Sequence, residues 1–358
     1  IAAGGAAGLG GAAFPTATKL ALGRASAAEL LLLNGAECEP WICCDDALMR
    51  ERAADVVLGA QVMLVAVGSG RCVIAIEDDK PAAIAAVESA ASSVGGARIE
   101  VRVLPAVYPL GAEGPLVAAV TGREVPHDGL PPQAGVVVQN VGTAAAVARL
   151  ARDGLPFTSR VVTVTGSGVR EPANLEARLG TPVADLVAAC GGYDAEEVRH
   201  IAGGSLTGRE LPGATVPLTK GLNCVLVATA ADLPARTREQ PCIRCGDCAS
   251  VCPVGLLPQL LYVAAGANDE TGLVQYGLSA CIECGCCDYV CPSALALTAR
   301  FHAARERRQL QELERRRALD AKARFERHRR RLEERADEER RAFDDARRRA
   351  RGTEAGSD

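Results

Sequence analysis

The stretch CIECGCCDYVCP, residues 281–292, places five cysteines within eleven consecutive positions. Residues 242–253, CIRCGDCASVCP, repeat its spacing, so that both segments follow the run C-x2-C-x2-C-x3-C-P. This run is typical of 4Fe-4S proteins, because three closely spaced thiolates can hold three corners of a cubane cluster from one loop, while the fourth cysteine reaches the neighbouring cluster. The doubled run predicts a small domain built around two 4Fe-4S clusters.

The spacing assigns the eight repeat cysteines to two ligand sets. One set is Cys242, Cys245, Cys248 and Cys291, and the other is Cys281, Cys284, Cys287 and Cys252. The fifth cysteine of the second repeat, Cys286, breaks the spacing, and we expect it to face away from the cluster as a spare thiol. A pair of zinc sites is the alternative, but zinc ribbons use paired C-x2-C knuckles and need no third cysteine. The pattern therefore favours iron–sulfur clusters.

Length and composition limit the class of protein to which the chain can belong. With 358 residues, 48% of them hydrophobic, it can form two or three domains with apolar cores. Nine of its 15 cysteines lie in the two repeats, eight of them at the repeated spacing, unlike the disulfide framework of a small secreted domain. No apolar run reaches the roughly 18 residues of a membrane-spanning helix and no signal peptide is recognisable, so we expect a reduced, cytoplasmic compartment. Because the sequence begins with Ile1 instead of Met, we expect a fragment whose true start is missing.

Hydrophobic periodicity divides the chain into four expected domains. Residues 1–158 alternate short apolar runs with alanine-rich segments of helical period, which predicts an α/β domain. Residues 159–233 contain two expected strands, RVVTVTG and NCVLVA, and a short helix in TPVADLVAAC, which indicates a small α+β domain. The segment PARTREQP, read as a linker, begins the cysteine-repeat domain, residues 234–300. Residues 301–358 form a charged tail.

The charged tail has no clear partner in the sequence. It mixes charges of both signs and contains no proline or glycine before Gly352, which favours a helix. Its sparse leucines and phenylalanines do not sustain a coiled-coil seam. A solvated helix or a disordered arm is one interpretation, and contact of its excess arginines with anionic headgroups or a partner subunit is another. We expect no nucleic-acid binding, because interleaved acids weaken the positive field and stacking aromatic residues are nearly absent.

A glycine loop near the start of the sequence suggests a phosphate site. Residues 8–16, GLGGAAFPT, satisfy the pattern G-x-G-x-x-A of a Rossmann dinucleotide site. We do not expect a Rossmann fold, because no strand precedes the loop and Phe14 and Pro15 stand where its helix should already run. Pro15 instead suits the start of a new helix, whose free amides could hold a phosphate together with Lys19. A glycine-rich surface turn is the alternative that the loop alone leaves open.

An acidic loop follows the first apolar strand. In NGAECEP, residues 34–40, Glu37 and Glu39 stand two positions apart directly after a run of leucines. Carboxylates in this place are most often surface caps, but they can also accept hydrogen bonds from ribose hydroxyls or a carboxamide. The adjacent Cys43 and Cys44 cannot readily ligate the same ion, and we expect them to bind no metal.

Five further motifs, together with the cysteine repeats, indicate a family. They are, in order, GLGGAAFPTATKL, NGAECEPWICCDDALMRE, VPHDG, QNVGT and RLGTPV. With this order and spacing, the chain from Ile1 to about residue 330 closely resembles the C subunit of the Rnf electron-transport complex. Its front half is also similar to the NADH-binding flavoprotein subunit of respiratory complex I, in which the corresponding loops surround FMN.

The resemblance implies roles for individual residues. Those on the phosphate side of FMN would be Gly8, Gly10, Gly11 and Lys19. Asn34 and Glu37 would contact the flavin ring. Glu39 would lie on the nicotinamide side. The residues that close the pocket would be Tyr108, Gly111 and Asn140. The middle domain would be a β-grasp soluble-ligand-binding domain. Ala13, where the family usually has glycine, and the turn IAGGSLTG depart from the family pattern and put the affinity for FMN in doubt.

The resemblance also implies a function. NADH gives up two electrons at once as hydride, whereas each 4Fe-4S cluster accepts one, and a flavin bridges this mismatch. Hydride transfer needs no general base, so we expect no catalytic side chain. The chain would be an NADH-dependent oxidoreductase component of an ion-translocating complex. It would pass electrons between NADH and ferredoxin through FMN and two 4Fe-4S clusters.

Partners and location follow from the same family. The chain would contact the iron–sulfur and membrane subunits of an Rnf complex, serve ferredoxin indirectly, and lie peripherally on the cytoplasmic face of the bacterial inner membrane. The family has a further domain ahead of the glycine loop, which this sequence lacks. Two other functions stay open. One is a soluble flavin and iron–sulfur cobalamin reductase, and the other is an electron-transfer adaptor that keeps its clusters but binds no flavin.

Overall fold

The computed structural model describes residues 1–94, 98–126, 129–233 and 238–354. It divides into two units, residues 1–301 and residues 302–358. Two features singled out in the sequence fall partly outside the described residues, namely the VPHDG motif at residues 127–128 and the expected linker at residues 234–237.

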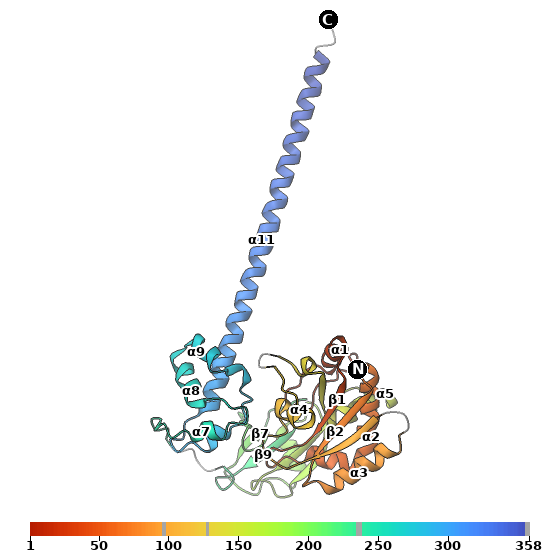
Figure 1. Cartoon of the computed structure of the whole chain (residues 1–358), viewed down its shortest axis with the longest axis vertical. Coiled ribbons are helices and arrows are strands. Elements are labelled where there is room, and N and C mark those ends of the chain that lie inside the picture. The colour runs from red at the N-terminus through yellow and green to blue at the C-terminus, as the bar shows by residue number, and fades with distance from the viewer. Residues whose placement is uncertain (95–97, 127–128, 234–237, 355–358) are drawn as a thin grey trace. The chain divides into compact units, whose positions relative to one another are not determined.

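The N-terminal domain is a parallel sheet flanked by helices (Figure 1). Its strands are β1 (Leu30–Gly35), β2 (Arg71–Glu77), β3 (Arg98–Leu104) and β4 (Val136–Asn140), in the spatial order β3-β2-β1-β4. Its helices are α1 (Thr16–Ala25), α2 (Cys44–Val67), α3 (Pro81–Ser92), α4 (Glu113–Thr121), the 3-10 helix η1 (Pro131–Ala134) and α5 (Val141–Asp153). Every strand pair in this sheet is parallel, as expected when helical crossovers alternate with strands.

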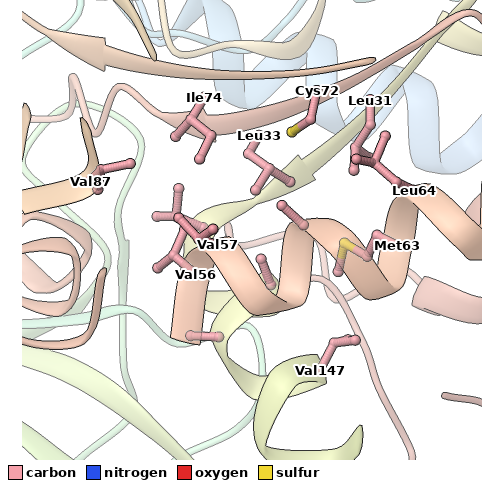
Figure 2. Close-up of a cluster of buried hydrophobic side chains, with 14 of the residues drawn as sticks. Leu31, Leu33, Val56, Val57, Met63, Leu64, Cys72, Ile74, Val87 and Val147 are labelled. Atoms are coloured by element: carbon pink, nitrogen blue, oxygen red, sulfur yellow. The ribbon is translucent and has the colours of Figure 1, made fainter. Parts of the chain in front are cut away.

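The strands are almost continuously apolar because helices cover both faces of the sheet. On one face, Leu31, Leu33 and Ile74 pack with side chains of α2, including Val56 and Met63 (Figure 2). On the other face, alternate residues of the same strands pack with α4. Each fully buried aliphatic side chain contributes about 1.5–3 kcal/mol. This double core therefore holds the strand ends, and the loops that follow them, in fixed positions.

The middle domain is a mixed sheet with one short helix. Its strands are β5 (Ser159–Thr165), β6 (Ala173–Arg178), β7 (Arg199–Ala202), β8 (Arg209–Glu210) and β9 (Cys224–Ala228), in the order β6-β5-β9-β7-β8, and α6 (Val183–Ala189) packs against them. The segments NCVLVA and TPVADLVAAC contain β9 and α6, and RVVTVTG covers β5 except for its first residue, Ser159, as predicted. The sequence does not predict β6, β7 or β8, because they are short or half-exposed and show no clear apolar alternation.

The cysteine-repeat domain consists mainly of short helices and loops. Its helices are α7 (Asp247–Ser250), α8 (Pro258–Ala267), α9 (Glu270–Gln275), the 3-10 helix η2 (Leu278–Ala280) and α10 (Cys286–Tyr289). Its fully buried side chains include Leu261, Leu273 and Phe301, and this apolar core is small. A domain with so small a core depends on cross-links or metal sites for its stability.

The C-terminal helix α11 (Leu297–Glu354) begins in the cysteine-repeat domain and continues through the charged tail (Figure 1). As far as residue 354, the last that the structure describes, the tail is therefore helical. Ion pairs between residues four apart, such as Glu312 and Arg316, stabilise this helix locally. Among the helices of the described residues, none combines the length and the apolar composition that crossing a bilayer requires.

Candidate functional site

The parallel sheet has a topological switch point between β1 and β4. The chain proceeds from β1 outward to β2 and β3, and then returns to the opposite side of β1 to form β4. In such sheets a crevice opens at the carboxyl ends of the two central strands, where ligands bind. Asn34, near the end of β1, pairs in register with Asn140 at the end of β4. Two residues that the family resemblance assigns to a flavin pocket therefore meet at the switch point.

Asn34 joins the end of β1 to the loop before α4. Its Nδ2 donates a hydrogen bond to the carbonyl oxygen of Gly111 at 2.8 Å, and its Oδ1 accepts one from the amide of Ala36 at 3.1 Å. The Gly111 amide donates to the sulfur of Cys38 at 3.3 Å, and a Cβ at Gly111 would lie 2.9 Å from this sulfur, so a side chain at position 111 would displace the sulfur. Burial raises the pKa of Cys38 to about 11, which keeps the thiol protonated at neutral pH.

Asn140 caps helix α5. Its Oδ1 accepts hydrogen bonds from the amides of Gly142 at 2.8 Å and Thr143 at 3.2 Å, which satisfies two donors of the first helical turn. Its Nδ2 donates to the carboxylate of Asp45 at 2.5 Å. Gly10 of the glycine loop lies against the same side chain, because a Cβ at Gly10 would be 3.4 Å from the Cβ of Asn140. The QNVGT motif thus has a structural role that does not depend on a ligand.

Glu37 caps helix α2 in a similar way. Its two carboxylate oxygens accept hydrogen bonds from the amides of Asp45 at 2.7 Å and Asp46 at 2.9 Å. Burial, and then the charge of Asp45, raise the pKa of Glu37 well above its ordinary value, and burial also raises the pKa of Asp45. The ligand atoms of Glu37, Cys44 and Asp45 lie within 4.8 Å of one another. Because both carboxylates already accept hydrogen bonds from the protein, we interpret the group as a buried polar network.

Arg160 of β5 supplies a positive charge beside this network. Its side chain is buried, and its guanidinium donates hydrogen bonds to the carbonyl oxygen of Leu9 at 3.0 Å and to that of Lys220. Burial lowers the pKa of Arg160, while the neighbouring Cys44 and Asp45 act in the opposite direction. The sequence does not single out Arg160, which stands at the start of an ordinary apolar strand. The structure shows that it joins the glycine loop to the middle domain.

The glycine loop is closed at its base by the amide of Gly8, which donates to the carbonyl oxygen of Phe14 at 2.8 Å. The first described strand, β1, comes only after α1, so the arrangement is not that of a Rossmann site, as predicted. Gly11 and Ala13 have positive φ angles of +109° and +50°. A left-handed conformation suits glycine but costs alanine about 1–2 kcal/mol. Ala13 therefore places backbone strain where the family usually has glycine.

Helix α1 begins directly after this loop. Its N-cap, Pro15, makes no side-chain hydrogen bond, and its first turn contains no acidic residue. The start of such a helix attracts an anion, because its first amides and its dipole are positive. Lys19 forms an ion pair with Glu113 at the start of α4, so a phosphate here would share Lys19 with that carboxylate. These features fit the phosphate group of FMN.

Glu39 contacts a turn of the middle domain. Its carboxylate accepts hydrogen bonds from the amides of Leu206 at 2.8 Å and Thr207 at 3.0 Å, and from the Thr207 hydroxyl at 3.2 Å. Gly204 in the same turn lies so near that a Cβ there would be 2.3 Å from the side chain of Glu39. This turn is the segment IAGGSLTG, so its departure from the family pattern falls directly beside Glu39.

Tyr108 lies in the loop before α4, residues 105–112, which we call the Tyr108 loop. Its hydroxyl donates a hydrogen bond to the carbonyl oxygen of Cys284 at 2.5 Å. Burial raises the pKa of Tyr108 well above its ordinary value, so the phenol stays protonated. The Tyr108 loop therefore contacts Asn34 through Gly111 and the second cysteine repeat through Tyr108.

The eight repeat cysteines line two hollows in the cysteine-repeat domain. One hollow is lined among others by Cys242, Cys245, Cys248 and Cys291. The other is lined among others by Cys252, Cys281, Cys284 and Cys287. Each hollow thus receives three cysteines from one repeat and the fourth from the other. The structure brings together the two ligand sets that the spacing predicts.

Both repeats fold in the same way around their hollows. The residues before the second cysteine, Arg244 and Glu283, have φ angles of +60° and +53°, and the glycines after it, Gly246 and Gly285, have φ angles of +89° and +76°. Such turns direct successive backbone amides toward one point and form an anion-binding concavity. A 4Fe-4S cluster held by four thiolates is anionic, so the backbone of both repeats fits such a cluster.

The prediction for the orientation of Cys286 is wrong. The sequence predicts that it faces away from the cluster, but Cys286 lines the second hollow together with Cys284 and Cys287. The chain turns at Gly285 directly into the one-turn helix α10, and Cys286 is its first residue. Its side chain therefore stays at the wall of the hollow, which the spacing alone does not reveal.

Models of three domain families match the chain one after another. The Nuo51 FMN-binding domain matches residues 1–149, the SLBB domain matches residues 161–210, and the 4Fe-4S dicluster domain matches residues 241–295. The predicted fold class is confirmed, with an α/β flavin-binding domain, a β-grasp domain, a two-cluster domain and a long charged helix. The predicted cofactors, FMN and 4Fe-4S clusters, are those of the matched domains. Fold and domain matches together define a protein that combines a flavin-binding domain, an SLBB domain and a 4Fe-4S dicluster domain.

Curated relatives cover most of this chain and give the class a more specific identity. The C subunit of the ion-translocating oxidoreductase complex of Pseudomonas aeruginosa is 46% identical over 278 residues, which are 78% of this chain and 36% of the relative. The protein of that name from Rhodobacter capsulatus is 44% identical over 278 residues, which are 78% of this chain and 53% of the relative. That from Erwinia tasmaniensis is 42% identical over 353 residues, which are 99% of this chain and 44% of the relative. The chain is therefore related to the C subunits of ion-translocating oxidoreductase complexes, as predicted, and spans about a third to a half of the length of these relatives.

Solved structures share the fold. A chain of an NAD+-reducing [NiFe]-hydrogenase in the H2-reduced state matches with a TM-score of 0.58 and 23% identity, over 87% of this chain and 61% of that chain. A chain of the enzyme in the air-oxidized state matches with a TM-score of 0.53 and 24% identity, over 62% of this chain and 44% of that chain. At these identities the likeness concerns the fold alone.

Proposed function

We propose that this chain passes electrons between NADH and ferredoxin through FMN and two 4Fe-4S clusters, as part of an ion-translocating complex of the Rnf type. The observation that carries the proposal is the hydrogen bond from Tyr108 to Cys284, which joins the candidate flavin site to a candidate cluster site. The similarity to the C subunits of ion-translocating oxidoreductase complexes supports the assignment to such a complex. When bound, FMN accepts hydride and gives up electrons singly, and each cluster carries one electron.

In this proposal the residues around the switch point bind and orient the flavin and the nicotinamide. The phosphate side is held by Gly8, Gly10, Gly11 and Lys19, the flavin ring by Asn34 and Glu37, and the nicotinamide side by Glu39, while the pocket is closed by Tyr108, Gly111 and Asn140. Glu39 would then share its hydrogen bonds between the nicotinamide and the turn at Leu206. None of these residues acts as a general base, because hydride transfer needs none.

The cysteine repeats hold the clusters in the two sets that the hollows bring together. One cluster is bound by Cys242, Cys245, Cys248 and Cys291, and the other by Cys281, Cys284, Cys287 and Cys252. The inward-facing amides of both repeats would donate to the cluster sulfurs and tune the reduction potentials. The functional domains would be residues 1–158, 159–233 and 234–300, with residues 301–358 as a charged tail.

The proposed partners are the iron–sulfur and membrane subunits of the complex, with ferredoxin served indirectly. The name of the relatives, which are subunits of an ion-translocating oxidoreductase complex, supports a peripheral place on the membrane. We place the chain on the cytoplasmic face of the bacterial inner membrane, where NADH is available.

Binding of FMN and oxidation of NADH test the flavin site separately from the clusters. The full chain is titrated with FMN by fluorescence quenching, and NADH oxidation is followed with ferricyanide as the electron acceptor. Replacing Asn34 with Ala removes the contact with Gly111, so FMN binding should weaken by about tenfold, since a hydrogen bond in such a site is worth about 1–1.5 kcal/mol. NADH oxidation should fall with it.

Asn223→Ala, at a partly buried asparagine of the middle domain, is the matched control and should leave both measurements unchanged. If the unsubstituted chain binds no FMN, the proposal fails and the adaptor without flavin is the better interpretation. If Asn34→Ala binds FMN and oxidises NADH like the unsubstituted chain, the assignment of the flavin site is wrong.

A further inference from the structure

We propose that the second cysteine repeat, not the first, holds the cluster that exchanges electrons directly with the flavin, and that Tyr108 is the positioning residue that fixes this order. The inference rests on the proposed function and adds the order of the two clusters to it. Three contacts between the N-terminal domain, the middle domain and the second repeat support it, as does the difference in exposure between the two repeats.

The first contact is the hydrogen bond from the Tyr108 hydroxyl to the carbonyl oxygen of Cys284, at 2.5 Å. The loop that carries Tyr108 is itself bound to the end of β1, because Asn34 donates to the carbonyl oxygen of Gly111 at 2.8 Å. Two hydrogen bonds therefore connect the switch point of the parallel sheet with the loop of the second repeat. They fix the position of this loop relative to the candidate flavin site.

The second contact is made by the turn between β7 and β8, residues 203–208. On one side, this turn donates hydrogen bonds to the carboxylate of Glu39. On the other side, the carbonyl oxygen of Leu206 approaches Gly285 so closely that a Cβ at Gly285 would lie 2.8 Å from it. Only glycine permits this approach together with a φ angle of +76°. The turn is therefore packed between the acidic loop and the second repeat.

The third contact distinguishes the two repeats by charge. Arg209 of β8 lies 4.0 Å from the carboxylate of Glu283, which stands between the first two cysteines of the second repeat. The corresponding residue of the first repeat is Arg244. Two arginines would repel each other at this distance, so the β7–β8 turn and Arg209 are complementary to the second repeat and not to the first.

The solvent exposure of the cysteines also distinguishes the second repeat from the first. Cys242 and Cys245 of the first repeat are exposed, whereas Cys281 and Cys284 of the second are half-buried and Cys287 is buried. The second repeat, which the Tyr108 loop and the β7–β8 turn contact, is thus less exposed than the first, whose Cys242 and Cys245 remain accessible.

The proposed order balances electrons and protons. One NADH gives one hydride, and with it two electrons, to the flavin, which also takes a proton from solvent. The two electrons leave the flavin one at a time, and each passes to the cluster of the second repeat, then to that of the first, and finally to a one-electron acceptor of the partner protein. The protons of the reduced flavin return to solvent.

Two variant chains, each lacking one cluster, test the order. A chain with Cys281→Ala and Cys284→Ala keeps only the cluster of the first repeat, and a chain with Cys242→Ala and Cys245→Ala keeps only that of the second. Each full chain is loaded with iron, sulfide and FMN under anaerobic conditions, and electron paramagnetic resonance after dithionite reduction identifies the remaining cluster. We expect NADH to reduce the remaining cluster of the second repeat as in the unsubstituted chain, and to fail to reduce that of the first. Equal reduction in both chains, or the reverse result, overturns the proposal.

Replacement of Tyr108 by Phe tests the junction without NADH. Loss of the hydrogen bond to Cys284 should speed hydrogen exchange of residues 281–291 about fivefold, since one such bond is worth about 1 kcal/mol, and leave residues 242–252 unchanged. It should also shift the reduction potential of the second cluster alone, because the loop that carries Cys284 loses its hydrogen bond and becomes more open to solvent. Tyr289→Phe is the matched control, because Tyr289 belongs to the same repeat but is 81% exposed.

The outcomes separate this inference from the proposed function. If Tyr108→Phe changes neither the exchange nor the potential of the second repeat, or changes both repeats equally, Tyr108 does not position the second cluster and the inference is wrong. If NADH reduces the flavin in no chain, the proposed function fails. The exchange and potential measurements, which use dithionite and no NADH, then still decide whether the junction selects the second repeat.

Discussion

The N-terminal domain and the cysteine-repeat domain hold their candidate sites in opposite ways. In the N-terminal domain, a parallel sheet buried on both faces fixes the strand ends, and Asn34, Glu37 and Asn140 are already hydrogen-bonded to the protein. In the cysteine-repeat domain, the candidate ligands lie on loops around two hollows, and the apolar core is small. The comparison teaches that the flavin site is built by the fold, whereas each cluster is itself a part of the core that it completes.

Removal of iron should have the largest effect and should affect one region only. Chelation of the clusters from the full chain removes the cross-links of the cysteine-repeat domain, so its amides between residues 238 and 296 should lose their protection from hydrogen exchange. The strands β1 and β2 should keep theirs. Hydrogen-exchange mass spectrometry of the loaded and the chelated chain measures both. If the repeats keep their protection from hydrogen exchange, or if β1 loses as much protection as they do, the proposed difference between the two domains is contradicted.

Shortening a buried side chain of the sheet core should have the next largest effect. Leu33 of β1 is fully buried against α2, and Leu33→Ala should lower the free energy of unfolding by about 2–5 kcal/mol. Urea unfolding followed by the fluorescence of Trp41, the single tryptophan of the sequence, measures the change. Val65→Ala on the same helix is the control, because Val65 is 78% exposed and the effect should stay within about 0.5 kcal/mol. A small loss for Leu33→Ala would mean that the core does not fix the strand ends.

Loss of a helix cap should have a smaller effect. Asn140→Ala removes the acceptor for the amides of Gly142 and Thr143, and the free energy of unfolding should fall by about 0.5–2 kcal/mol. Asn140→Ser keeps a capping oxygen and should recover most of this loss, although it also lacks the contact with Asp45. The same urea titration compares the two variants. If Ser and Ala are equally destabilising, the contact with Asp45 matters more than the cap.

A further effect should appear in the pH dependence of stability. Burial raises the pKa of Glu37 from 4.5 to about 8. A carboxyl with a raised pKa in the folded state contributes its stability in full below the unfolded value of 4.5, and this contribution is lost as the pH rises through the folded value. The free energy of unfolding should therefore decline between pH 5 and pH 8 in the unsubstituted chain.

Glu37→Gln should reduce the slope of this decline, whatever its effect at a single pH. Glu51→Gln serves as the control, since Glu51 is exposed and should leave the slope unchanged. Urea titrations at several pH values measure the slopes. An equal slope in Glu37→Gln and the unsubstituted chain would show that Glu37 does not titrate in this range.

The sequence predicted the cysteine-repeat domain through its chemistry and the N-terminal domain through its periodicity. The spacing predicts the ligand sets because each set depends on three cysteines of one local loop and on one cysteine of a second loop with the same spacing. The parallel α/β architecture could be read because its strands are continuous apolar runs. The strands β7 and β8 could not, because β7 joins the sheet by pairing with β9, which lies more than twenty residues away, and the two-residue β8 pairs only with β7.

The contacts between domains could not be predicted from the sequence. Arg160 contacts Leu9 across 151 positions, and Tyr108 contacts Cys284 across 176 positions. Neither contact has a local pattern, because each depends on how separate domains pack. The orientation of Cys286 was predicted wrongly for a related reason, since the turn at Gly285 and the start of α10 determine it. The resemblance named Tyr108 and Glu39, but only the structure shows which other domains they contact.

Anaerobic titration of the full chain with NADH tests the central claim most directly. The chain is loaded with FMN and clusters, and the absorbance of the flavin and of the iron–sulfur clusters is recorded together. The account predicts that both bleach, with about two NADH per chain, because the flavin takes two electrons and each cluster one. If dithionite bleaches the clusters while NADH bleaches only the flavin or nothing, electrons do not pass from NADH to the cysteine repeats, and the account is contradicted.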